Sequence, residues 1–157
     1  MMRFESTQLP GVWLVEPECR VDERGLFARV FCAREFQAHG LVTEYVQCST
    51  SFTRERGTIR GLHYQLPPFS EVKLVRCTGG AIHDVIVDLR RDSPTYLQHV
   101  AVELSAQNRR TLYVPEMCAH GYQALTDECE VAYQMSRFYA PETAAGLRFD
   151  DPALAIH

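Results

Sequence analysis

Residues 60–73 hold the densest group of side chains able to perform acid–base chemistry. On an extended chain the side chains alternate between two faces, so Gly61, His63 and Gln65 share one face. An unperturbed histidine titrates at about pH 6.5, so His63 can accept a proton at neutral pH. We therefore take His63 as the candidate general base.

Lys73 ends this segment and is the only lysine among the 16 basic residues. A protein surface usually recruits lysine and arginine together, so a solitary lysine among apolar neighbours indicates a specific role. Its ammonium is a compact charge whose pKa responds to burial. Such a group is suited to stabilising an oxyanion.

Two further clusters contain polar and aromatic residues. Residues 115–122 place His120 in what we expect to be a turn-rich connection between strands. Residues 133–139 contain Tyr133, a candidate general acid, and Tyr139. Packing in the core or at its rim is the alternative role for both tyrosines. With the arginines, which suit a phosphorylated ligand, this set indicates proton abstraction beside a carbonyl of a phosphate-bearing substrate.

The sequence lacks the usual signals for a bound metal or nucleotide cofactor. The residue two positions after His63 is Gln65, whereas small metal-binding barrels often place a second histidine there. His83 and Asp84 are adjacent, so a strand would direct them to opposite faces. No glycine-rich phosphate loop or dinucleotide fingerprint is present. We expect a reaction without metal or cofactor.

The composition predicts one globular domain covering residues 1–157, with 46% hydrophobic and 23% charged residues. A formal charge of -4 disfavours nucleic acid or an anionic membrane as a partner. We find neither an apolar run long enough to cross a bilayer nor a signal peptide. The six cysteines form no C-x-x-C pair, and we expect reduced thiols in a cytoplasmic protein.

Period-2 alternation dominates the chain and predicts the elements that position these residues. In residues 82–89 the alternation separates a face with Val85 and Val87 from one with Asp84 and Ile86. Residues 73–77 and 82–89, separated by Thr78-Gly79-Gly80, are expected to form a hairpin. Frequent turns between short strands predict an all-β sandwich or barrel. One helix is expected over 33–39, with Gly40 after it, and a short helical turn is expected from Ser105.

Several stretches resemble the dTDP-4-dehydrorhamnose 3,5-epimerases. They cover nearly the whole chain in order, and the segment around His63 is the most specific. The matching stretches are 22–27 (DERGLF), 57–65 (GTIRGLHYQ), 73–77 (KLVRC), 84–90 (DVIVDLR), Pro115-Glu116, 119–121 (AHG), 139–142 (YAPE) and 150–154 (DDPAL).

The resemblance implies a cupin-type jelly roll that forms a homodimer without a metal or nucleotide cofactor. The family epimerises dTDP-4-keto-6-deoxy-D-glucose at C3 and C5, in dTDP-L-rhamnose synthesis. The resemblance also implies that His63 removes a proton beside the C4 ketone and that Lys73 stabilises the enolate oxygen. Tyr133 would return a proton from the opposite face. Inversion requires two such groups on opposite sides of the sugar.

The resemblance also implies the residues that bind substrate. Arg24 and Arg60 would bind substrate, in part through its diphosphate, and one of them is a candidate to reach across the dimer interface. Tyr139 would stack on the nucleobase. The remaining members of this set, expected to line the pocket or contact substrate, are Phe27, Gln47, Ser49 and His120.

The chain departs from the family pattern at several positions. Arg29 and Ser49 replace a glutamate and an asparagine, and Ala144 and Ala145 precede Gly146 where the family usually has a glutamate. Family members also continue beyond the position of His157, with an aspartate that pairs with the catalytic histidine. Asp84 is the candidate internal substitute, and its alternative role is that of a structural hydrogen-bond acceptor.

These departures leave alternatives open for the activity. One is an epimerase that acts at a single centre or on another nucleotide sugar. Another is a non-catalytic cupin that binds a nucleotide sugar. A third is a metal-dependent cupin enzyme.

Overall fold

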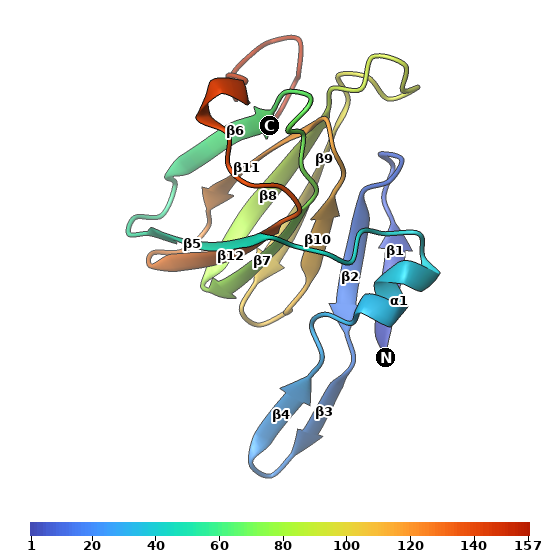
Figure 1. Cartoon of the computed structure of the whole chain (residues 1–157). Coiled ribbons are helices and arrows are strands. Elements are labelled where there is room, and N and C mark those ends of the chain that lie inside the picture. The colour runs from blue at the N-terminus through green and yellow to red at the C-terminus, as the bar shows by residue number, and fades with distance from the viewer.

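The computed structural model describes residues 1–157 and consists mainly of two antiparallel sheets that face each other (Figure 1). The six-stranded sheet has the order β1 (Met2–Ser6), β2 (Trp13–Pro17), β10 (Thr111–Val114), β7 (Lys73–Gly79), β12 (Cys129–Met135) and β5 (Gln47–Thr53). The five-stranded sheet has the order β13 (Ala144–Gly146), β6 (Ile59–Gln65), β11 (Cys118–Ala124), β8 (Ala81–Asp88) and β9 (His99–Ser105). The predicted all-β cupin-type jelly roll is confirmed.

Alternation along each strand decides which side chains enter the space between the sheets. On β8, Ile82 and Ile86 join the main core of 15 buried residues. Val85 and Val87 lie on the opposite face, where Leu154 from the C-terminal segment covers them. The two faces predicted for this strand are therefore confirmed, and Asp84 lies on the inner face with Ile82 and Ile86.

The predicted hairpin between β7 and β8 is wrong. β7 pairs with β10 and β12, whereas β8 pairs with β9 and β11 in the facing sheet. Gly80, at a φ of +69°, lies in the turn that carries the chain from one sheet to the other. The alternation of side chains is the same in a hairpin and in a crossing between sheets, so the pattern does not distinguish them.

Helical structure is confined to two short elements. Helix α1 spans Ala33–Ala38, and Gly40 follows it with a φ of +68°, as the sequence predicts. The short turn expected from Ser105 is present, closed by a 3.0 Å hydrogen bond from Arg109 N–H to the Ser105 carbonyl, and it does not extend into a helix. The second element is the 3-10 helix η1, Pro141–Thr143. Neither element has the length and apolar character needed to cross a membrane.

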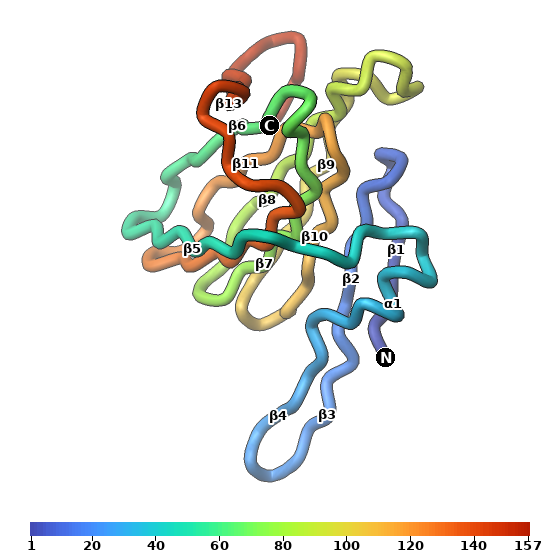
Figure 2. The backbone as a smooth tube through the Cα atoms, in the orientation of Figure 1, coloured from blue at the N-terminus to red at the C-terminus, as the bar shows by residue number.

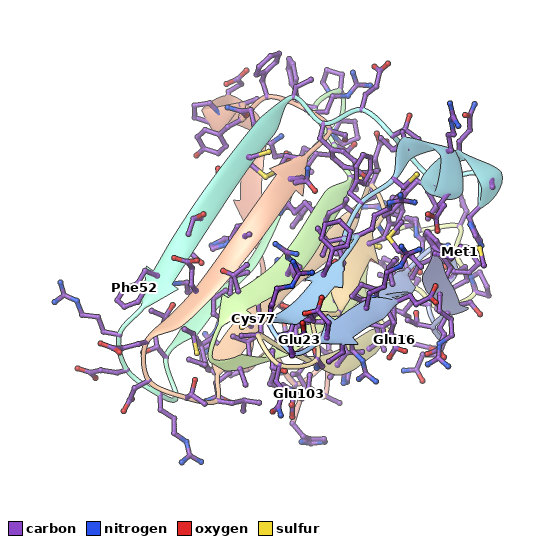
Figure 3. All side chains as sticks on the ribbon, turned by 90° about the horizontal axis from the view of Figure 1, so that it is seen from below. Met1, Glu16, Glu23, Phe52, Cys77 and Glu103 are labelled. Carbon is purple, nitrogen blue, oxygen red and sulfur yellow. The ribbon has the colours of Figure 1, made fainter.

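A third, two-stranded sheet projects from the barrel as a hairpin (Figures 1 and 2). It consists of β3 (Cys19–Asp22) and β4 (Gly25–Ala28). Its apolar side chains are exposed, with Val21 75% and Phe27 71% accessible. Figure 3 shows this hairpin from below, with Glu23 at its tip. The hairpin has no packing partner within the chain that would bury these side chains.

Buried thiols line part of the barrel interior. The Cys77 thiol donates to the Gly79 carbonyl at 3.1 Å, and the Cys129 thiol donates to the Ala81 carbonyl at 3.2 Å. Burial raises the pKa of Cys77 to about 11 and that of Cys118 to about 12. All six cysteines are free, and Cys19 and Cys48 are exposed.

Candidate active site

Two neighbouring strands bring the two histidine motifs of the sequence together. His63 on β6 is the register partner of His120 on β11. A Cβ atom on Gly61 would lie 2.6 Å from Gly121 Cα, and one on Gly121 would lie 2.7 Å from the Arg60 carbonyl oxygen. Only glycine allows this approach at both positions, and Gly61 also has a φ of +113°. Gly61, two residues before His63, and Gly121, next to His120, therefore allow the two strands to approach closely.

His120 lies inside strand β11, so its predicted position in a connection is wrong. The turn signal at Pro115-Glu116 is real, but it ends with Met117 at a φ of +58°, and the strand begins directly afterwards. His120 Nε2 donates to Asp84 Oδ1 at 2.7 Å. Asp84 is fully buried, and its Oδ2 has no hydrogen-bond partner. In this structure Asp84 is thus the acceptor for His120 and is not hydrogen-bonded to His63.

The surroundings of His63 favour the neutral imidazole. Partial burial lowers the pKa of His63, and the neighbouring charges of Lys73 and His120 lower it further. The side chain is exposed on one side, which leaves it accessible to a ligand. A neutral, accessible imidazole is the form that a general base requires at neutral pH.

Lys73 begins strand β7 and is paired with a carboxylate. Its Nζ lies 3.5 Å from Glu71 Oε1, and the two side chains are only 13% and 10% exposed. Burial lowers the pKa of Lys73, while the charges of Glu71 and Asp84 act in the opposite direction. Gln65 Nε2 donates to Glu71 Oε2 at 3.4 Å and to the Phe69 carbonyl at 2.8 Å. Glu71 therefore positions the Lys73 ammonium, and Gln65 in turn positions Glu71.

Tyr133 on β12 completes the cluster from the six-stranded sheet. Its ring lies 6.0 Å from the ring of His120 in an edge-on arrangement. Burial raises the pKa of Tyr133, and a hydrogen bond with Ser51 at 3.3 Å opposes that rise. The nearby Asp84 charge adds to the rise. An imidazole, an ammonium and a phenol from three strands thus meet around the Asp84–His120 pair.

The expected substrate-binding residues of the barrel lie around this cluster. Arg60 Nε donates to Thr53 Oγ1 at 2.9 Å. Gln47 Oε1 accepts a 2.5 Å hydrogen bond from the Tyr139 backbone N–H, and the Tyr139 side chain is 65% exposed. Ser49 is exposed on β5, in register with Tyr133. The exposed ring of Tyr139 is therefore available for stacking on another flat ring.

The structure does not bring Arg24 and Phe27 to this cluster within one chain. Both lie on the projecting hairpin, where Arg24 Nη2 is paired with Asp22 Oδ2 at 2.6 Å. Arg29 just beyond β4 pairs with Glu35 of α1 at 3.3 Å. Any contact of the hairpin with an active site would therefore require a second chain.

The comparisons with known proteins agree with this geometry. Residues 6–157 match the family model described as dTDP-4-dehydrorhamnose 3,5-epimerase. The chain belongs to this family. A dTDP-4-dehydrorhamnose 3,5-epimerase from Methanothermobacter thermautotrophicus is 45% identical over 154 residues, which cover 98% of this chain and 82% of that protein.

Solved structures of the epimerase family show the same fold. The Bacillus anthracis enzyme, solved with TDP and PPi bound, matches with a TM-score of 0.97 and 38% identity, covering 99% of this chain and 89% of that one. The Legionella pneumophila enzyme, in complex with dTDP-4-keto-L-rhamnose, gives a TM-score of 0.93 and 36% identity, covering 99% and 82%.

Several residues of the candidate site were not predicted from the sequence. Glu71 lies two positions before Lys73, a spacing that places both on one face of an extended chain. Ser51 and Thr53 alternate on β5 and direct hydroxyl groups inward, to Tyr122. The alternation of polar residues within a strand was the sequence signal that could have identified Ser51 and Thr53. No group of three or more histidine, cysteine, aspartate or glutamate side chains lies close enough to hold a metal ion.

Proposed function

We propose that this chain epimerises a dTDP-linked 4-keto-6-deoxyhexose at C3, at C5 or at both centres. Its membership of the epimerase family supports the reaction class, and the ligands of the related structures, TDP and dTDP-4-keto-L-rhamnose, support the substrate class. The observation that carries the proposal is the gathering of His63, Lys73 and Tyr133 around one buried pair.

The proposed reaction transfers protons only. His63 takes the proton from the carbon beside the C4 ketone, and the electron pair of that bond moves to the ketone oxygen as an enolate. The Lys73 ammonium stabilises this oxygen, and Tyr133 gives its proton to the same carbon from the opposite face, which inverts the centre. The oxidation state of the sugar does not change, so these proton transfers require no redox cofactor.

The other residues of the site would bind and orient the substrate. In the proposal, Arg60 contacts the diphosphate, because a guanidinium matches phosphate oxygens with paired hydrogen bonds. Tyr139 stacks on the nucleobase, and Gln47 and Ser49 line the pocket. His120, held by Asp84, lines the pocket beside the sugar.

Solvent exchange tests the proposal directly. The enzyme is incubated with dTDP-4-keto-6-deoxyglucose in deuterated water, and deuterium is measured at C3 and C5 by NMR. We expect incorporation by the wild type and a loss of about 10²–10⁴-fold in the His63→Ala variant. Equal incorporation by both proteins would refute the proposal, and binding of dTDP without any exchange would indicate a non-catalytic binding protein. The positions labelled show whether one or both centres react.

The projecting hairpin supports a homodimer. An isolated two-stranded hairpin is marginally stable in water. Exposed apolar side chains such as Val21 and Phe27 are typical of a surface that contacts another protein. We propose that each hairpin packs on a second copy of the chain and carries Arg24 to the partner's active site.

Coexpression of two inactive variants tests this arrangement. Arg24→Gln and Lys73→Ala would each disable the sites that contain them. If Arg24 acts across the interface, a mixed dimer contains one intact site, so random pairing restores about a quarter of wild-type activity. If Arg24 acts within its own chain, both sites of the mixed dimer stay defective and no activity returns.

We also place the reaction in the cytoplasm. All six cysteines are free thiols, and thiols persist in reducing compartments. Cell fractionation with antibodies to the protein would test this, and recovery in an exported fraction would contradict it.

A further inference from the structure

A continuous chain of hydroxyl groups runs from Tyr133 to a guanidinium. The Tyr133 hydroxyl lies 3.3 Å from Ser51 Oγ, which lies 2.9 Å from the Tyr122 hydroxyl. The Tyr122 hydroxyl lies 3.0 Å from Thr53 Oγ1, which accepts from Arg60 Nε at 2.9 Å. These hydrogen bonds connect β12 and β5 of one sheet with β11 and β6 of the other.

The guanidinium fixes the direction of these hydrogen bonds. It has donors and no acceptor, so Thr53 Oγ1 must accept from Arg60. Thr53 and Tyr122 are each only 2% exposed, and a buried hydroxyl proton needs an acceptor. The neighbouring acceptor for the Thr53 proton is the Tyr122 hydroxyl. Tyr122 then donates to Ser51, and Ser51 donates to Tyr133.

With these directions, one hydroxyl proton, that of Tyr133, is not used in a hydrogen bond. Each hydroxyl group has a single proton, and the protons of Thr53, Tyr122 and Ser51 are each donated to the next hydroxyl in the row. Tyr133 accepts a hydrogen bond from Ser51 and donates none within the structure, so its proton remains available to a substrate. After that proton leaves, the Ser51 hydroxyl faces the phenolate oxygen as a donor.

We propose that Tyr122 is a positioning residue that, through Ser51, orients Tyr133 as the proton donor of the inversion step. A hydrogen bond to a charged oxygen is stronger than one to a neutral oxygen. The Ser51 hydroxyl therefore stabilises the phenolate form of Tyr133 more than the phenol form. The inference rests on the proposed function, because it concerns the second of its two proton transfers. Removal of a carbon-bound proton by His63 does not depend on it.

The Tyr122→Phe variant tests the inference, since it removes one oxygen atom and keeps the ring. In deuterated water, His63 can remove a proton and return deuterium to the same face, which labels the substrate without inverting it. We expect this exchange to stay within about twofold of wild type. We expect formation of inverted product to fall about tenfold to a hundredfold, the usual effect of losing a hydrogen bond to a charged group. The ratio of exchange to inversion therefore rises.

Matched variants separate this role from a general loss of structure. Tyr45→Phe removes a partly buried tyrosine hydroxyl outside the site, which donates to the Val42 carbonyl at 3.0 Å, and should leave the ratio unchanged. Ser51→Ala should raise the ratio as Tyr122→Phe does, and Ser51→Thr, which keeps a hydroxyl, should restore it. If Tyr122→Phe does not fold, the Ser51 pair decides the question.

The outcomes distinguish the inference from the proposed function. An equal fall of exchange and inversion in Tyr122→Phe and Ser51→Ala would overturn the inference, as would wild-type behaviour of both. Absence of exchange and inversion in the wild type itself would refute the proposed function. A raised ratio in both variants, with recovery in Ser51→Thr, supports the inference.

Discussion

Glu71 offers a quantitative test of how Lys73 is kept charged. Their charged atoms are 3.5 Å apart in a site where both side chains are nearly buried. Coulomb attraction at that distance is about 5 kcal/mol at an effective dielectric constant of about 20. Desolvation of the two charges offsets part of it. A net value of about 1.5–3 kcal/mol is typical of hydrogen bonds to charged groups, so the loss of Glu71 should move the alkaline limit of activity by a measurable amount.

The sign of the effect follows from the charge that the reaction needs. Burial lowers the pKa of Lys73, and Glu71 counteracts this. Glu71→Gln removes the counteracting charge, so the pKa of Lys73 falls further. The ammonium is lost as pH rises through that pKa. Turnover by the variant should therefore decline at a lower pH than turnover by the wild type, and the two should agree below that decline.

The assay is kcat as a function of pH for the wild type, Glu71→Gln and the control Glu55→Gln, whose carboxylate is exposed. Asp84 and His63 also face Lys73, and they are unchanged in all three proteins. An alkaline decline at the wild-type pH, or at a higher pH, would refute the reasoning. A loss of kcat by the same factor at every pH would indicate a structural effect of the substitution.

Three further predictions concern turnover and stability. Lys73→Ala should lower kcat by about 10²–10³ while calorimetric dTDP affinity stays near wild type, because the enolate charge exists mainly beyond the ground state; equal losses would contradict this. Gly121→Ala places a methyl group 2.7 Å from the Arg60 carbonyl oxygen, and urea unfolding should show a loss of about 1–3 kcal/mol; an unchanged midpoint would contradict the close strand approach. Asp88 is fully buried, and although burial raises its pKa, hydrogen bonds from Arg90 and two hydroxyl groups lower it overall. Its stabilisation is present above the unfolded pKa of about 3.9 and is lost as pH falls through the folded pKa, so Asp88→Asn should cost about 3–5 kcal/mol at neutral pH; a Tm difference from wild type that does not shrink in acid would count against this.

Much of the fold and of the site could be predicted from local patterns. Period-2 alternation predicts the strands and the two faces of β8, because one face of each strand must enter the core. The residue types at His63, Lys73 and Tyr133 indicate the chemistry, because few side chains exchange protons or stabilise an enolate. Their gathering in one place depends on strands that are distant in sequence.

Long-range arrangement is where prediction from the sequence failed. The turn at Gly80 joins strands of different sheets, and alternation has the same period in both arrangements. Whether Asp84 pairs with His120 or with His63 depends on the register of β8, β11 and β6, which no single segment specifies. The relation of Arg24 to the site involves the projecting hairpin, and a single chain contains no surface that positions it.

The buried and exposed cysteines allow local opening of the barrel to be measured by alkylation. Cys19 and Cys48 are open to an alkylating reagent, whereas Cys77, Cys118 and Cys129 react only when the strands around them separate. The slow phase of alkylation therefore measures how frequently the barrel opens. A nucleotide sugar that binds only the closed form should slow that phase in proportion to its occupancy, which would report ligand binding without any turnover.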